Sequence, residues 1–226
     1  MVKAVLFDAG DTLFRVRGSV GEAYAAVAAR HGVVVAPADI EPRFRAAFRR
    51  MPPLGFPAAA PAELPDREYA WWKAVAAASF AGLSFANFDA FFRDLFEHFA
   101  AADAWALFPD ALPALRALQA RGLRLAIVSN FDGRLLPICD GLGIAGLFEA
   151  IVISGRVGYA KPDPRIFEIA LAGLGVAPAE AVHVGDNERE DLAGARAAGL
   201  RALLVERGGG AAADRVSALT ELAELV

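Results

Sequence analysis

The chain has 226 residues, of which 56% are hydrophobic, so it is long enough for one domain with a sizeable core, or for a core with an insert. Its formal net charge of -4 argues against non-specific nucleic-acid binding, and its one cysteine excludes an internal disulfide. No apolar stretch approaches the roughly 18 residues of a membrane span, so we expect a cytoplasmic protein that binds neither nucleic acid nor membrane.

The first predicted element is a buried strand over residues 2–8, VKAVLFD, which ends in Asp8. Residues 15–104 then carry helical patterns and no strand signal. Within that segment, the Pro-rich stretch 51–65 interrupts the helices and predicts a long loop. This part of the sequence therefore predicts an all-helical insert that follows the first strand.

The rest of the chain, residues 105–226, alternates between strand and helix patterns. Its apolar runs are rich in Val, Ile and Leu without alternation, and they predict buried strands over 123–130, 148–154, 181–186 and 201–206. Helical patterns separate them over 132–143, 164–175 and 189–200, and a last helical pattern covers 214–225. Strand and helix in alternation predict an α/β fold, in which right-handed crossovers connect the strands of a parallel sheet and helices cover both of its faces.

Polar residues stand at the carboxyl ends of the predicted strands, which is where ligands bind in open α/β sheets. They are Asp8 after the first strand, Ser129 and Asn130 after the second, Lys161 after the third, and Asp186 and Asp191 after the fourth. Three carboxylates that lie close together repel one another unless a cation joins them, and oxygen ligands favour Mg²⁺. A metal and a lysine neutralise a substrate phosphate, and a carboxylate attacks phosphorus. The set therefore predicts phosphoryl transfer with a small phosphorylated substrate.

Four sequence motifs coincide with these strand ends: FDAGDTL (7–13), VSN (128–130), AKPDP (160–164) and VGDNERED (184–191). In their order and placement, the chain resembles the haloacid dehalogenase-like hydrolase superfamily. The segments GEAYA, WW and SNFDGRL make it similar to the type three group of hydrolase-domain-containing proteins. The resemblance implies a Rossmann-like core formed by residues 1–14 and 105–226, with an inserted helical cap over 15–104.

The resemblance also implies a role for each matching residue. Asp8 would be the nucleophile, and Lys161 would hold it close to the phosphate. Thr12, Ser129 and Asn130 would form the substrate-binding set. The Mg²⁺ ligands would be Asp8, the backbone carbonyl of Gly10, Asp186, and Asp191 either through water or in a supporting position.

The motif around the nucleophile departs from the phosphatase pattern of this superfamily. Those enzymes place a second aspartate two residues after the nucleophile, where it protonates the leaving group and then activates water. This chain has Gly10 at that position and Asp11 one residue later. General acid–base catalysis contributes roughly 10²–10⁴ in rate, so phosphatase activity is expected to be weak on poor leaving groups unless Asp11 reaches the site.

Two other functions remain open at this stage. The metal-independent 2-haloacid dehalogenases of the superfamily also lack the second aspartate, but the acids Asp186 and Asp191 favour a metal-dependent enzyme. A second alternative is a non-catalytic protein that binds phosphate or regulates a partner on the same scaffold. His183 lies inside a predicted strand, and we interpret it as a core histidine.

Overall fold

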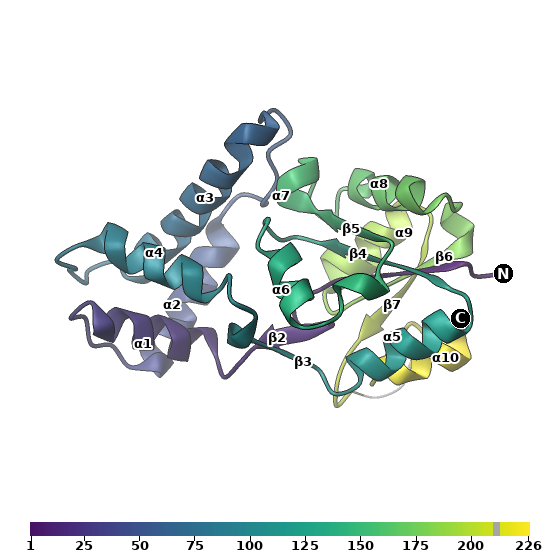
Figure 1. Ribbon diagram of the computed structural model, residues 1–226, viewed down its shortest axis with the longest axis horizontal. Helices are drawn as coiled ribbons and strands as arrows, with labels where there is room; N and C mark the ends of the chain where they lie inside the picture. Colours follow the sequence, from purple (N-terminus) through teal and green to yellow (C-terminus); the bar gives the residue numbers. More distant parts are fainter. Residues whose placement is uncertain (210–212) are drawn as a thin grey trace.

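The computed structural model describes residues 1–209 and 213–226. Its larger sheet lies on the right of Figure 1, among helices. The sheet has six strands in the order β5-β4-β1-β6-β7-β8, and all neighbouring strands are parallel. The strands are β1 (Ala4–Phe7), β4 (Arg124–Ser129), β5 (Ala150–Ile153), β6 (Ala181–Gly185), β7 (Arg201–Val205) and β8 (Arg215–Val216). The predicted parallel sheet is confirmed, and β1 lies inside it, between β4 and β6.

Helices cover both faces of this sheet, because successive side chains of each strand point to opposite sides. Val5 and Phe7 pack into the core beneath α5, α6 and α10, whereas Ala4 and Leu6 pack beneath α8 and α9. These helices are α5 (Ala111–Ala120), α6 (Leu135–Gly141), α8 (Pro164–Leu174), α9 (Gly194–Ala197) and α10 (Leu222–Leu225); the short α7 (Ser154–Val157) follows β5. The double coverage explains why the strands read as continuous apolar runs.

A separate group of helices lies beside the sheet, on the left of Figure 1. We call α1 (Val20–Arg30), α2 (Pro37–Arg50), α3 (Leu64–Ser79) and α4 (Phe88–His98) the helical insert. Ser19 and Glu22 form a capping box that begins α1, and the Asn87 side chain accepts from an amide at the start of α4. The insert has an aromatic core of its own, which includes Tyr24, Phe80 and Phe91.

A two-stranded antiparallel sheet joins the helical insert to the rest of the molecule. It pairs β2 (Phe14–Val16) with β3 (Trp105–Leu107), so both chain crossings between the two parts lie side by side. The sequence pattern does not predict these strands. Each has only three residues, and exposed Arg15 in the first removes any apolar run.

Two of the predicted helices differ in the structure. The pattern over 214–225 contains β8, which pairs at the sheet edge, and only the last four residues before Val226 form α10. The pattern over 189–200 is divided between a π-helical segment, Glu188–Ala193, and the short α9. Among the described residues, no helix is long and apolar enough to cross a membrane.

Candidate active site

The chain turns sharply after β1 and leaves Asp8 at the edge of the sheet. The Asp8 amide donates to the Val184 carbonyl of β6 at 2.9 Å, which continues the sheet pairing for one residue. The Ala9 carbonyl then accepts from the amides of Leu13 and Phe14, so the chain folds back at once. Asp8 is 7% exposed and Thr12 is fully buried. The tight turn therefore brings both predicted site residues to the carboxyl end of the central strand.

Two neighbouring segments donate hydrogen bonds to the Asp8 carboxylate. Ser129 Oγ at the end of β4 lies 3.0 Å from Asp8 Oδ1, and Lys161 Nζ lies 2.6 Å from the same oxygen. Burial raises the pKa of Asp8 and the nearby Asp191 carboxylate adds to this effect, while Lys161 opposes it. The three residues predicted from separate motifs are thus in direct contact.

The Lys161 ammonium group lies between two buried carboxylates. Its Nζ atom is 2.6 Å from Asp8 Oδ1 and 2.6 Å from Asp191 Oδ1, and the residue is only 3% exposed. Burial disfavours the charged amine, but Asp8 and Asp191 outweigh this effect and raise the pKa of Lys161. Asn130 fixes the backbone of the lysine, because its Oδ1 accepts from the Lys161 amide at 2.7 Å. Lys161 is therefore held as a cation beside the predicted nucleophile.

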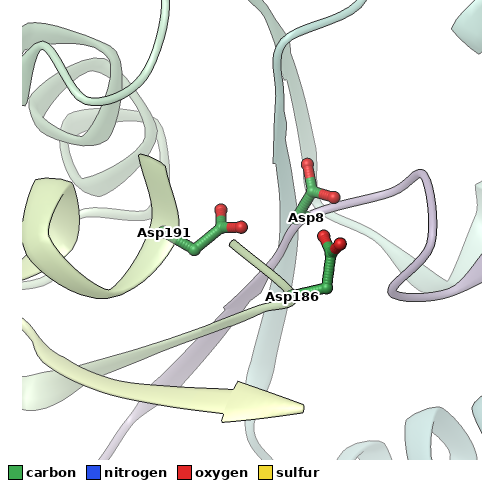
Figure 2. Close-up of side chains that lie close together, drawn as sticks. All are labelled: Asp8, Asp186 and Asp191. Carbon is green, nitrogen blue, oxygen red and sulfur yellow. The ribbon is translucent and has the colours of Figure 1, made fainter. Parts of the chain in front are cut away.

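Three carboxylates, those of Asp8, Asp186 and Asp191, come together at this edge of the sheet (Figure 2). One oxygen from each lies within 4.8 Å of the other two. Asp186 is exposed and follows β6, and Thr12 Oγ1 approaches its Oδ1 at 3.4 Å. Desolvation, together with Asp8 and Asp191, raises the pKa of Asp186 to about 7. Mutual repulsion within an oxygen-only donor set fits a hard divalent cation such as Mg²⁺.

Asp191 reaches this cluster from the π-helical segment after β6. The Asn187 side chain accepts from two amides at the start of that segment, and the Asn187 amide donates to Asp191 Oδ2 at 3.0 Å. A Cβ atom at Gly185 would overlap the Asp191 carboxyl group, so glycine is required at the end of β6. Burial alone would raise the pKa of Asp191, but Lys161 and His183 lower it instead.

His183 is a contact of the site that the sequence analysis assigns only to the core. The ring is fully buried against Phe167, and its Nε2 lies 2.9 Å from Asp191 Oδ1. Burial lowers the pKa of His183 and favours the neutral imidazole, and the carboxylate of Asp191 as partner assigns the ring proton to Nε2. The sequence correctly places His183 inside a strand. It does not predict the contact with Asp191, because residues eight apart in sequence form no recognisable motif. Glu190 is also missed; its Oε2 accepts from Asn130 Nδ2 at 2.9 Å.

Gly10 and Asp11 lie in the turn that follows Asp8, and the Asp11 carboxylate is close enough to contribute to the raised pKa of Asp186. Asp11 has a left-handed backbone, with φ of 56°, which aspartate tolerates better than most residues. The residue is exposed, but the protein around its carboxyl group removes part of the water shell and raises the pKa of Asp11, and Arg45, Arg15 and Arg207 oppose that rise. Arg45 belongs to α2, so Asp11 lies within electrostatic reach of the helical insert.

The sequence and the fold resemble those of known hydrolases. Haloacid dehalogenase-like hydrolase domain-containing protein 3 of Mus musculus is 40% identical over 211 residues, which cover 90% of this chain and 82% of that protein. A phosphoserine phosphatase of Thermus thermophilus is 44% identical over 121 residues, or 53% of this chain and 46% of the relative. The structure of L-2-haloacid dehalogenase from Xanthobacter autotrophicus matches the fold with a TM-score of 0.73 at 22% identity, covering 100% of this chain and 98% of the other. Because the family model for haloacid dehalogenase-like hydrolases matches residues 2–199, the chain belongs to that family of hydrolases.

Proposed function

We propose that this hydrolase is a Mg²⁺-dependent phosphatase that acts on a small phosphorylated metabolite through a phosphoryl group on Asp8. The observation that carries the proposal is the arrangement around Asp8, where Ser129 and Lys161 donate to one carboxylate oxygen and Asp186 and Asp191 lie within 4.8 Å. The likeness to a phosphoserine phosphatase over about half of the chain supports the same reaction class.

The nucleophile in this proposal is the carboxylate of Asp8. It attacks phosphorus and forms an acyl phosphate while the bond to the leaving oxygen breaks, and water then attacks that phosphorus to release phosphate and restore the carboxylate. Lys161 keeps its positive charge at this position because two carboxylates surround it, so it offsets the charge of the incoming phosphate. Ser129 Oγ lies against Asp8 and Thr12 Oγ1 lies against Asp186, and in this proposal both hydroxyl groups orient phosphoryl oxygens.

Asp8, Asp186 and Asp191 would hold the metal ion, with the Gly10 carbonyl as a further oxygen donor. When bound, Mg²⁺ neutralises the carboxylates and the substrate phosphate. His183 and the Asn187 amide fix the orientation of Asp191 through hydrogen bonds of 2.9 and 3.0 Å. Such supporting contacts keep a carboxylate in the geometry that a metal ligand needs.

Protonation of the leaving group is the step for which this site offers no well-placed acid. Position 10 has no side chain, and the next acid, Asp11, is exposed in a left-handed turn, where Arg45 and Asp186 are its electrostatic neighbours. We therefore propose that good substrates carry leaving groups that need little protonation. An activated ester such as p-nitrophenyl phosphate is expected to react faster than an alkyl phosphate.

The proposal is tested by hydrolysis of p-nitrophenyl phosphate with Mg²⁺ and after its removal with EDTA. Asp8→Asn is expected to lower kcat by at least about 10³-fold, on the scale of a lost nucleophile, and EDTA is expected to abolish turnover. An unchanged rate in Asp8→Asn would reject the mechanism. Chloride release from 2-chloropropionate without metal would favour a dehalogenase, and phosphate binding without any Asp8-dependent turnover would favour a binding protein.

A further inference from the structure

Helix α3 of the helical insert contacts the loop that follows β4 through two buried acids. Trp72 Nε1 donates to Asp132 Oδ2 at 2.6 Å, and the Gly133 amide donates to Glu68 Oε2 at 3.1 Å. Asp132 is fully buried and Glu68 is 6% exposed. Both bonds cross from the insert to the sheet-bearing part of the molecule, and we call Glu68, Trp72 and residues 132–134 the anchor.

Arg134 extends the anchor to α4. Asp132 accepts from the Arg134 amide and Nε at 2.9 Å through Oδ1, and from Nη2 at 2.7 Å through Oδ2. The guanidinium group lies 3.9 Å from the centre of the Phe96 ring and 5.1 Å from that of Trp72. Its Nη1 donates to the Phe96 carbonyl at 3.3 Å. Asp132 thus orients the cation that holds both helices, and it accepts the Trp72 indole proton itself.

Two glycines make room for the Glu68 carboxylate. A Cβ atom at Gly155, in α7, would lie 2.5 Å from Glu68 Oε1, and one at Gly133 would lie 3.3 Å from Glu68 Oε2. Oε1 is buried and has no hydrogen-bond partner among residues 1–209 and 213–226. A buried oxygen without a partner is costly. The bond from the Gly133 amide to Oε2 and the close packing around the carboxyl group offset that cost and keep Glu68 in place.

The anchor continues directly into the active site, because residues 129–134 form one short segment. Ser129 contacts the Asp8 carboxylate, and the Asn130 side chain bonds both backbone groups of Lys161, at 2.7 Å to its amide and 3.0 Å to its carbonyl. A displacement of Asp132 therefore acts only two residues from Asn130. The geometry points to Asp132 as a positioning residue, which couples docking of the helical insert to the placement of Ser129, Asn130 and Lys161. The catalytic consequence rests on the proposed function, whereas the coupling itself does not.

Amide hydrogen exchange in the free full-length protein tests this coupling. Trp72→Phe keeps an aromatic ring and removes the N–H that Asp132 accepts. We expect exchange to become roughly tenfold faster at Gly133, whose amide bonds Glu68, and at Lys161, whose amide bonds Asn130. Trp71→Phe is the matched control, since Trp71 packs against the Trp72 ring but its indole bonds the Pro52 carbonyl, between α2 and α3, and not Asp132. It should leave both amides unchanged.

The exchange rate of the Lys161 amide distinguishes coupling to the active site from a packing change confined to the anchor. If Trp72→Phe leaves its exchange rate at the wild-type value, or if Trp71→Phe accelerates it equally, the proposal is overturned. A second pair of variants avoids reliance on one tryptophan. A Cβ atom at Gly155 would lie 2.5 Å from Glu68 Oε1 and 3.1 Å from the Phe131 carbonyl, so Gly155→Ala disturbs both sides of the anchor and should accelerate the same two amides, whereas Gly146→Ala adds a methyl in open space and should not. Gly155→Ala with wild-type rates would also contradict the proposal.

Kinetics then separate this proposal from the proposed function. In an active phosphatase, Trp72→Phe should lower kcat on p-nitrophenyl phosphate by about tenfold, while Trp71→Phe stays within about twofold of wild type. A wild-type protein with no phosphatase activity would reject the proposed function, and the exchange rates would still support or reject the coupling. Faster exchange at Lys161 combined with unchanged kcat would overturn the catalytic part of the inference.

Discussion

Gly10 occupies the position at which the phosphatases of this family carry their second aspartate. A Cβ atom there would meet nothing within 4 Å, and its backbone is not in the left-handed region. A β-carbon therefore fits at this position without strain. Packing does not require glycine at this position. Its effect is that the site lacks a side chain that could act as a general acid.

Gly10→Asp is expected to raise kcat on an alkyl phosphate by about 10²-fold, because it supplies a general acid next to Asp8. The gain should be much smaller on p-nitrophenyl phosphate, whose leaving group needs little protonation. Parallel assays of both substrates measure the difference. An unchanged rate in Gly10→Asp, together with a large loss in Asp11→Asn, would instead assign the proton transfer to Asp11.

In the proposed Mg²⁺ site, Asp186 sets the expected pH dependence of metal binding. The pKa of this carboxyl group is raised to about 7, so below that pH a proton occupies it and competes with Mg²⁺. Affinity should thus weaken by up to about tenfold per pH unit as the pH falls from 7 to 6, and change little above 8. Titration calorimetry at pH 6, 7 and 8 measures this. Equal affinity at pH 6 and pH 8 would contradict it.

At the scale of elements, α3 carries a buried acid whose ionisation opposes folding. Burial raises the pKa of Glu68; the Gly133 amide opposes the rise, Asp132 adds to it, and Arg156 and Arg134 oppose it. The folded state therefore holds the Glu68 proton more tightly than the unfolded state does. Its contribution to stability is greatest at low pH and is lost as the pH rises through the raised pKa.

Glu68→Gln should remove this pH-dependent loss, since glutamine does not ionise. The free energy of unfolding of Glu68→Gln minus that of wild type is expected to be larger at pH 8 than at pH 4. Urea denaturation at both pH values measures the change, with the exposed Glu63→Gln as a control. A Glu68→Gln variant whose stability falls below wild type by the same amount at both pH values would refute the assignment.

The helices and strands differ in how well the sequence predicts them. Strands such as β1 and β6 are recognisable because residues like Leu6 and Val184 are buried by helices on both faces. The strands β2, β3 and β8 have two or three residues each, which is too short for any pattern. The π-helical turn that carries Asp191 depends on Asn187 and on the missing side chain of Gly185, neither of which is distinctive alone.

For the whole molecule, parallel strands make the site predictable, whereas the contacts between the helical insert and the rest of the molecule are hard to predict. Ser129, Lys161 and Asp186 converge on Asp8 because the carboxyl ends of neighbouring strands meet at one edge. Contacts between distant segments follow no such rule. Trp72 and Asp132 are 60 residues apart in sequence, so only the packed structure brings them together.

The tryptophans give the molecule a built-in optical probe. All three indole N–H groups are bonded, but Trp71 and Trp105 donate to the backbone carbonyls of Pro52 and Phe99, whereas Trp72 donates to a carboxylate. A protein in which Trp71 and Trp105 are replaced by phenylalanine would emit from Trp72 alone. Its emission wavelength and lifetime would then report, without any added dye, each time the junction between the two parts of the molecule opens to water.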